Sequence, residues 1–280
     1  MASTAARRTG VFLLVLAGLW ALWEGFKWVG ERTELTIGTF MVNDVTFPHL
    51  HDIIGQLFEP SRRNGPLLIE VLWDAALFTA KEAVAGFLLG ATIGLLIGIV
   101  LHHSRLLQRG FLPYIVASQT VPILAIAPMV VVYLGGELQA PAWVSVSVIA
   151  AYLTFFPVTV NTLRGLASAD PQALELMRSY AASNWSILWH LKLPASLPYL
   201  FAAFKVAATA SVVGAMIGEL PSSIQDGLGG AIINFNQYYL SSPPSLWATN
   251  LVAALLGVSF FLVVVLVEKL VVRRPPEYLA

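Results

Sequence analysis

Few residues of this chain have the types and spacing that catalysis or metal binding requires. The sequence has 280 residues, with 16 acidic and 16 basic side chains, five His and no Cys. His102 and His103 are adjacent, and His49 and His51 flank one residue, so neither pair has the spacing of a metal motif. The sequence also contains no clustered acid, base and nucleophile, and no Gly-x-x-x-x-Gly-Lys-Ser/Thr phosphate loop. We therefore expect no enzyme activity, no metal site and no cofactor bound by this chain.

A second set of residues places polar groups within apolar sequence. Two adjacent polar residues stand one residue before a proline in the stretch PYIVASQTVPILAIAPMVVVYLGG. A proline inside a helix frees a backbone carbonyl, which membrane depth tolerates where protein or a water-filled cavity satisfies it. These side chains either line a pathway or bond to neighbouring helices, and a carboxylate at the end of a span either serves a pathway or lies at the water interface. The candidate lining residues are Gln119, Thr120, Pro122, Tyr152, Asn161 and Glu219.

The elements that position these residues are membrane helices. The chain is 57% hydrophobic and 11% charged, whereas a soluble domain carries about 25% charged residues. A spanning helix needs roughly 20 mostly apolar residues. Six segments qualify: 10–29, 83–101, 111–134, 141–162, 199–219 and 247–267. We expect an all-α integral membrane protein with six transmembrane helices, and we interpret the first as a retained helix because it ends in tryptophans rather than in a cleavage site.

The distribution of basic residues predicts the orientation. With the N-terminus in the cytoplasm, the inside segments contain ten of the 16 basic residues, and the short outside loops at 135–140 and 220–246 contain none. Both termini are therefore expected to be cytoplasmic, and so is the polar segment at 163–198. The expected organisation is an N-terminal helix at 1–30, an extracytoplasmic loop with short helices at 31–82, a core at 83–272 and a cytoplasmic tail at 273–280.

A stripe of glycines predicts close helix packing in the second span. Gly86, Gly90, Gly94 and Gly98 recur every four residues and therefore lie on one helix face. Small residues at this spacing let another backbone approach closely. We expect static packing here, and a sliding surface is the alternative.

The segment from Leu163 to Pro198, called the coupling segment below, has helix signals and an apolar side. Asp170 followed by Pro171 is a helix start, and Ser183 can cap a second short helix, NWSILWHL, expected to end before Pro194. Trp and Leu side chains on a solvent-facing element are costly unless something covers them. The segment is therefore expected to bind a soluble partner.

The coupling segment resembles the EAA loop of the permease subunits of bacterial ABC importers of the type I fold. The motif has Glu-Ala-Ala, three residues, Gly, nine residues and Ile-x-Leu-Pro. This chain keeps the spacing, with Glu175-Leu176-Met177, then Ala181 in place of Gly, then Leu191-Lys192-Leu193-Pro194. Ala181 is expected at a bend with positive φ, at a cost of roughly 1 kcal/mol or more. The stretch SQTVPILAIAPMVVVYLGG resembles the nitrate, sulfonate, taurine and pyrimidine-precursor branch, and the likeness covers about residues 70–270.

The resemblance implies a type I permease fold in a bacterial inner membrane, with cytoplasmic coupling helices. It implies a second permease subunit, ATPase subunits that bind ATP and Mg²⁺, and an external solute-binding protein. The residues that match the coupling motif or lie beside it are Glu175, Ala181, Ala182, Ser183, Trp185, Leu191, Leu193 and Pro194. We expect import of a small organic heterocycle, such as a pyrimidine or a vitamin-like compound. A small anion such as nitrate, sulfonate or taurine is the alternative substrate, and a secondary transporter or channel is the alternative class.

Overall fold

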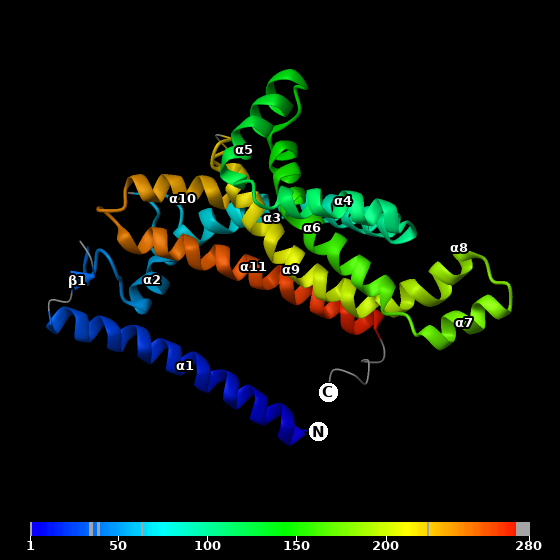
Figure 1. Cartoon of the computed structure of the whole chain (residues 1–280). Helices are drawn as coiled ribbons and strands as arrows, with labels where there is room; N and C mark the ends of the chain where they lie inside the picture. Colours follow the sequence, from blue (N-terminus) through cyan, green and yellow to red (C-terminus); the bar gives the residue numbers. More distant parts are fainter. Residues whose placement is uncertain (1, 34–35, 38–39, 63, 223, 273–280) are drawn as a thin grey trace. The chain divides into compact units, whose positions relative to one another are not determined.

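The structure is a computed structural model that describes residues 2–33, 36–37, 40–62, 64–222 and 224–272 (Figure 1). It is almost entirely helical, with one two-stranded antiparallel sheet, β1 (Thr36–Ile37) and β2 (Phe40–Met41). The helices are α1 (Ala2–Arg32), α2 (Leu50–Gln56), α3 (Leu68–His103), α4 (Arg105–Ser118), α5 (Ile123–Val132), η1 (Tyr133–Glu137), α6 (Ala142–Ala167), α7 (Pro171–Ser179), α8 (Asn184–Ile187), η2 (Leu188–Lys192), α9 (Leu193–Glu219), α10 (Leu228–Gln237) and α11 (Pro243–Val271), where η denotes a π-helical turn. The predicted all-α membrane fold is confirmed.

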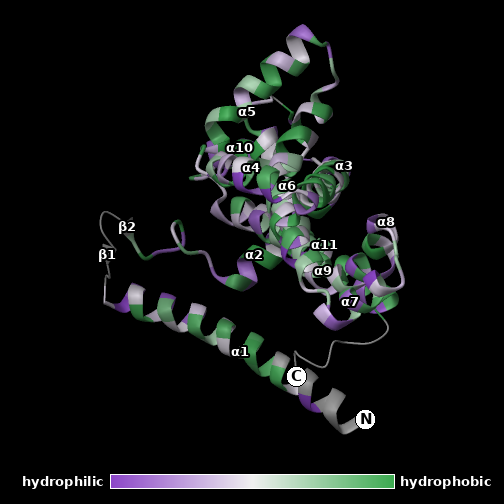
Figure 2. Ribbon diagram, turned by 45° about the vertical axis from the view of Figure 1, so that its right-hand side comes forward, coloured by the Kyte–Doolittle hydropathy of each residue, from purple (hydrophilic) through white to green (hydrophobic). Residues whose placement is uncertain are grey.

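Five helical segments of the described chain are long and apolar enough to cross a membrane, and a sixth span is possible if one bent pair is counted. Figure 2 shows the long helices as mainly hydrophobic and α7 as rich in hydrophilic residues. The five segments are Leu13–Arg32, Leu68–His103, Ala142–Ala167, Asn184–Glu219 and Pro243–Val271. They correspond to five of the six predicted spans.

The third predicted span, at 111–134, is not one helix. Residues Arg105–Ser118 and Ile123–Glu137 form two helical pieces with an angle of 91° between them. Pro122 has no N–H and disfavours a helical residue before it, so the chain breaks there, whereas Pro113 and Pro128 are accommodated inside helices. Just before the break, the Ser118 hydroxyl donates to the Ile115 carbonyl at 2.7 Å and the Thr120 hydroxyl donates to the Ala117 carbonyl at 2.8 Å.

Contacts divide the chain into two compact units, Met1–Trp73 with Ile232–Val252, and Asp74–Ala231 with Ala253–Ala280. In the second unit α6 and α9 pack along each other and form its centre (Figure 1). Close approach of α6 and α9 depends on small residues, since a Cβ on Gly165 would come within 2.7 Å of the Ser196 Cβ. Buried alanines and valines of α3, α6 and α9 make up the apolar core of this unit.

The glycine stripe of α3 packs on α6, as its spacing predicts. A Cβ on Gly86 would lie 2.8 Å from the Ser147 carbonyl, and a Cβ on Gly90 would lie 2.7 Å from the Thr154 Cβ. Gly94 and Gly98 approach α6 just as closely further along the helix. Side chains at these positions would push the two backbones apart, so the stripe sets the distance between α3 and α6.

The first unit joins α1 to the loop that follows it. The Trp23 indole donates to the Pro48 carbonyl at 3.2 Å and packs edge-on against Trp247, with ring centroids 5.4 Å apart. Lys27 is fully buried and pairs with Asp44. The hydrogen bond from Lys27 holds the pKa of the Asp44 carboxyl below its usual value. These contacts anchor the C-terminal part of α1, whereas the Leu side chains nearer its N-terminus, such as Leu14, are exposed.

Candidate functional site

The coupling segment forms two short helices joined by a tight bend, and its helix starts are those that the sequence predicts. Asp170 caps α7 by accepting a hydrogen bond from the Gln172 N–H at 3.1 Å. Ser183 caps α8 by accepting from the Ser186 N–H at 3.2 Å. Figure 1 shows α7 and α8 together at one end of the α6 and α9 pair.

The bend between the two helices is centred on Ala181. Its φ is 52°, which is the left-handed conformation expected where the motif has Gly. The Ala181 N–H bonds to the Arg178 carbonyl at 2.9 Å, and the Ala182 N–H bonds to the Met177 carbonyl at 3.0 Å. These bonds close the last turn of α7 and keep the bend at this residue despite the strain of a Cβ.

The sequence predicts that the second helix of the segment ends before Pro194, and this prediction is wrong. Residues Asn184–Glu219 instead run as one helical span through α8, η2 and α9. Pro194 takes one of the first positions of α9, directly after the π-helical turn of η2. A π turn changes the hydrogen-bond ladder locally, so a proline that lacks an N–H can be placed without ending the helix. The coupling segment is therefore mechanically continuous with a membrane span.

The exposed surface of the coupling segment is rich in large apolar side chains. Tyr180 is 78% exposed, Trp185 67% and Trp189 51%, and the two indoles pack edge-on at 5.5 Å. Of the residues assigned to coupling, Glu175, Ala181, Ser183, Trp185 and Pro194 are exposed, and Ala182, Leu191 and Leu193 are half-buried. Exposed aromatic side chains in this density are typical of a protein-binding surface.

A hollow beside these indoles is lined by α3, α7, α8 and η2. Its walls include His103, Leu174, Arg178 and Trp185. His102 at the end of α3 and Lys192 in η2 meet there, with 2.8 Å between Nε2 and Nζ.

A second contact lies where α6 leads into the coupling segment. The Ser168 hydroxyl donates to the Gly165 carbonyl at 2.7 Å and more weakly to the Ala195 carbonyl at 3.4 Å. These contacts tie both ends of the segment to the helices that enter it.

The candidate lining residues fall into separate places. The Tyr152 hydroxyl of α6 donates to the Ser118 carbonyl, so Tyr152 lies at the break between α4 and α5, where Gln119, Thr120 and Pro122 are half-buried or exposed. The Asn161 amide donates to the Pro157 carbonyl of its own helix at 2.8 Å. The structure therefore brings four of the six residues together at the break, whereas the hydrogen bonds of Asn161 and Glu219 within the described residues go to other groups.

Glu219 is fully buried in a polar cluster. The Thr79 hydroxyl of α3 donates to Glu219 Oε1 at 2.6 Å, and the Gly229 N–H at the start of α10 donates to Oε2. The Leu228 N–H donates to the Thr79 hydroxyl at 2.9 Å. A Cβ on Gly229 would lie 2.8 Å from the Glu219 Cβ, so glycine allows this close approach. The carboxyl group thus joins α3, α9 and α10.

Sequence reasoning missed Thr79 and Glu82, because the second predicted span begins at residue 83. Glu82 is fully buried beside Glu219, and neither of its carboxylate oxygens accepts a hydrogen bond from the described residues. Two carboxylates that were both ionised would repel each other in such a buried site. The sequence feature that could have revealed them is the spacing of Thr79, Glu82 and Gly86, which puts all three residues on one helix face.

Comparisons with known proteins agree with this geometry. Residues 90–274 match the family described as "Binding-protein-dependent transport system inner membrane component". The riboflavin transport system permease protein RibX of Chloroflexus aurantiacus is 30% identical, over 72% of this chain and 73% of its own length. The formylaminopyrimidine transport permease protein ThiX of Halalkalibacterium halodurans is 32% identical, over 63% of this chain and 67% of its own length.

A solved structure supports the fold. The crystal structure of an amino acid ABC transporter with histidines contains a chain that superposes with a TM-score of 0.52 at 18% identity, covering 72% of this chain and 94% of that one. The family match covers more than half of the present chain. Together with the apolar helices, it shows a multi-pass inner-membrane protein. The chain therefore belongs to the binding-protein-dependent transport system inner membrane components, the permease subunits of ABC importers.

Proposed function

We propose that this chain forms the translocation pathway of an ATP-driven importer and that its coupling segment binds an ATPase subunit. The family works with ATPase and binding-protein partners. The single observation that carries the proposal is the exposed aromatic surface of α7, α8 and η2, which includes Trp185 and Trp189. A large exposed indole on a soluble-side element is most readily explained by a partner that buries it.

The continuity of α8, η2 and α9 supplies a mechanism for coupling. A movement imposed on Trp185 acts on one end of a helical span that ends at Glu219, about 50 Å away at 1.5 Å per residue. The contact between His102 and Lys192 carries the same movement to α3. ATP-driven closure of the partner then shifts the permease between inward-open and outward-open states, provided the partner binds the two states with different affinity.

The break between α4 and α5 is the proposed pathway lining. Gln119, Thr120 and Pro122 belong to non-helical backbone at membrane depth, and Tyr152 reaches the same place from α6. Irregular backbone is tolerated at membrane depth where it is buried in protein or faces a water-filled cavity. Asn161 and Glu219 remain candidates for parts of the pathway away from this break.

We propose a neutral or weakly charged organic heterocycle as the substrate. The relatives named for riboflavin and formylaminopyrimidine transport support this chemistry. Lys205, whose charge would attract an anion, is already paired with Glu268 at 2.6 Å, so it offers little net attraction to an anionic substrate. A small anion such as nitrate, sulfonate or taurine is the alternative.

The proposed complex contains two permease subunits, identical or closely related, two ATPase subunits and an external binding protein. Both termini of the chain lie in the cytoplasm in this proposal. Basic residues support the orientation, since Arg105, Arg164, Arg178 and Lys192 lie in or beside the coupling segment and its neighbouring helix ends. Arg273 and Arg274, which support the same orientation in the sequence, lie outside the described residues.

Purification from native membranes tests the proposal. A tagged chain should co-purify with a phosphate-loop ATPase, and vesicles containing the complex should take up labelled heterocycle only with ATP and the binding protein. Mass spectrometry of small molecules released from that binding protein identifies the substrate class. Uptake that proceeds without ATP would show a secondary transporter or channel, and taurine or nitrate as the released ligand would show the anion alternative.

A further inference from the structure

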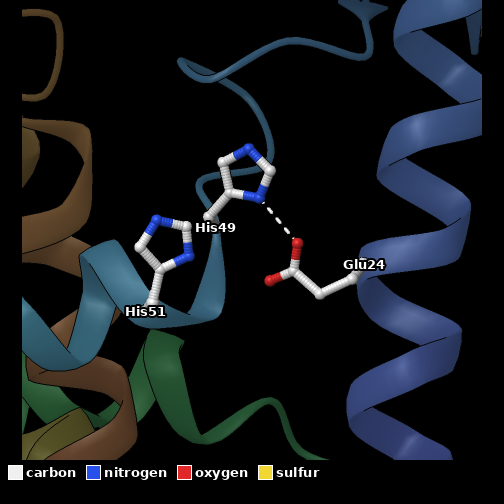
Figure 3. Close-up of side chains that lie close together, drawn as sticks. All are labelled: Glu24, His49 and His51. Atoms are coloured by element: carbon white, nitrogen blue, oxygen red, sulfur yellow. Dashed lines mark hydrogen bonds and ion pairs between the residues drawn. The ribbon is translucent and has the colours of Figure 1, made fainter.

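The first unit contains a cluster of metal-ligating side chains that the sequence does not reveal. Glu24 lies near the end of α1, and His49 and His51 lie at the start of α2, so the carboxylate is 25 residues from the nearer histidine. One ligand atom of each residue lies within 4.8 Å of the others. Figure 3 shows both imidazole rings on the side of the Glu24 carboxylate that faces α2.

We propose that Glu24, His49 and His51 form a binding site for a divalent transition-metal cation, with Zn²⁺ as the best match. Two imidazoles and one carboxylate are a ligand set that Zn²⁺ accepts at about 2.0–2.2 Å, with a fourth position left for water or another ligand. Tetrahedral ligands at such distances are about 3.3 Å apart, so the separations here, all within 4.8 Å, have to close by at most about 1.5 Å. His51 is exposed, and rotation of its side chain can supply this movement.

Carboxylate oxygens lie near both ring nitrogens of His49 and near Nε2 of His51. His49 Nδ1 is 2.6 Å from Glu24 Oε2, and His49 Nε2 is 4.0 Å from Asp44 Oδ1. His51 Nε2 is 3.2 Å from Asp52 Oδ1. If each ring binds the ion through Nδ1, the His51 Nε2–H can donate to Asp52, which is the arrangement that orients metal-binding histidines, whereas His49 Nε2 lies beyond hydrogen-bond distance of Asp44.

The residues also have a structural role without an ion. Glu24 Oε1 accepts the Leu50 N–H at 3.1 Å and so takes the place of a capping side chain at the start of α2. An ion bound to Glu24 Oε2 leaves this bond in place. Metal binding would therefore add a cross-link between α1 and α2, on the extracytoplasmic side in the proposed orientation.

Calorimetric titration of the purified full chain with Zn²⁺ tests the site, provided the affinity tag contains no histidine. The expected result is saturable binding of about one equivalent per chain. Glu24→Gln, His49→Ala and His51→Ala should each weaken the binding at least tenfold, whereas the control His103→Ala should not change it. No saturable binding by the wild type, or unchanged binding in all three variants, would overturn the proposal.

A second measurement does not depend on how well the variants fold. Electron paramagnetic resonance of the wild-type chain loaded with one equivalent of Cu²⁺ should show splitting from two nitrogen ligands, and binding should weaken as the pH falls because protons compete for imidazole. A spectrum of fully hydrated Cu²⁺, or one without nitrogen splitting, would refute the assignment.

Discussion

The coupling segment and the Glu219 cluster, formed by Glu219, Thr79, Gly229 and Glu82, both contain side chains that are unfavourable in their surroundings. The coupling segment exposes apolar side chains, whereas the cluster buries polar ones. The coupling segment leaves Tyr180, Trp185 and Trp189 exposed, although they are large and apolar. The Glu219 cluster instead buries two carboxyl groups among apolar helices and satisfies one of them through Thr79 and Gly229. In the proposed function the first region depends on a partner, whereas the second satisfies Glu219 within the chain.

This difference indicates where substitutions should act. Loss of an exposed side chain of the coupling segment, such as Trp185, should leave the fold intact and weaken assembly, because the chain itself does not bury that side chain. Loss of Glu219 should weaken the fold, because its donors come from two other helices. The helical span from Asn184 to Glu219 joins the two regions, so a partner bound at one end can act on the other.

The largest effect is expected from Glu219→Ala. The Thr79 hydroxyl and the Gly229 N–H would lose their acceptor in a buried site, which lowers the free energy of unfolding by about 2–4 kcal/mol. Thermal unfolding in detergent, followed by circular dichroism, measures this loss. Glu219→Gln keeps one acceptor oxygen and should lose less; an alanine variant as stable as the wild type would show that the cluster does not hold α3, α9 and α10 together.

Trp185→Ala should weaken binding to the ATPase subunit and leave the stability of the chain almost unchanged. We expect an unfolding free energy within about 0.5 kcal/mol of the wild type, since the side chain is exposed. Binding to the ATPase subunit should weaken by about 2 kcal/mol, or roughly 30-fold, if Trp185 is a central contact. Titration of purified ATPase against the permease in nanodiscs measures this. Leu266→Ala, an exposed apolar position outside the segment, is the control, and equal losses in both variants would argue against a specific contact.

Glu82→Met should stabilise the chain. The Glu82 oxygens accept no hydrogen bond from described residues, and an apolar side chain of similar volume removes a buried polar group, with an expected gain of about 1–1.5 kcal/mol. The same unfolding assay measures the change. A clear loss of stability would mean that the Glu82 carboxyl has a hydrogen-bond partner such as an ordered water. Both carboxyl groups of the cluster would then be satisfied by hydrogen bonds.

The smallest effect is expected at the bend of the coupling segment. Ala181→Gly removes the strain of a Cβ at positive φ, offset in part by the greater freedom of glycine in the unfolded chain, for a net gain of about 0.5–1 kcal/mol. Ala182→Gly is the matched control, because Ala182 is not in the left-handed region and should lose stability. Equal effects of the two substitutions would contradict the role given to the bend.

The sequence by itself determined the membrane class, five of the spans, the glycine packing face and the helix starts of the coupling segment. These features follow from local composition and periodicity: runs of apolar residues, glycines four apart, and the Asp170-Pro171 and Ser183 caps. The positive φ at Ala181 was also predictable, because the spacing of the motif places this residue at the bend.

Only the tertiary structure decided how distant residues meet. The pairing of Glu82 with Glu219 and the meeting of Glu24 with His49 join segments far apart in the chain. The structure also decided between a 91° break at Pro122 and an unbroken helix through Pro194, which the sequence alone did not distinguish. A proline permits either a break or a π turn, and an acidic residue permits either burial or exposure. Whether a polar group can be buried depends on the neighbouring helices, because a buried polar group requires hydrogen-bond partners.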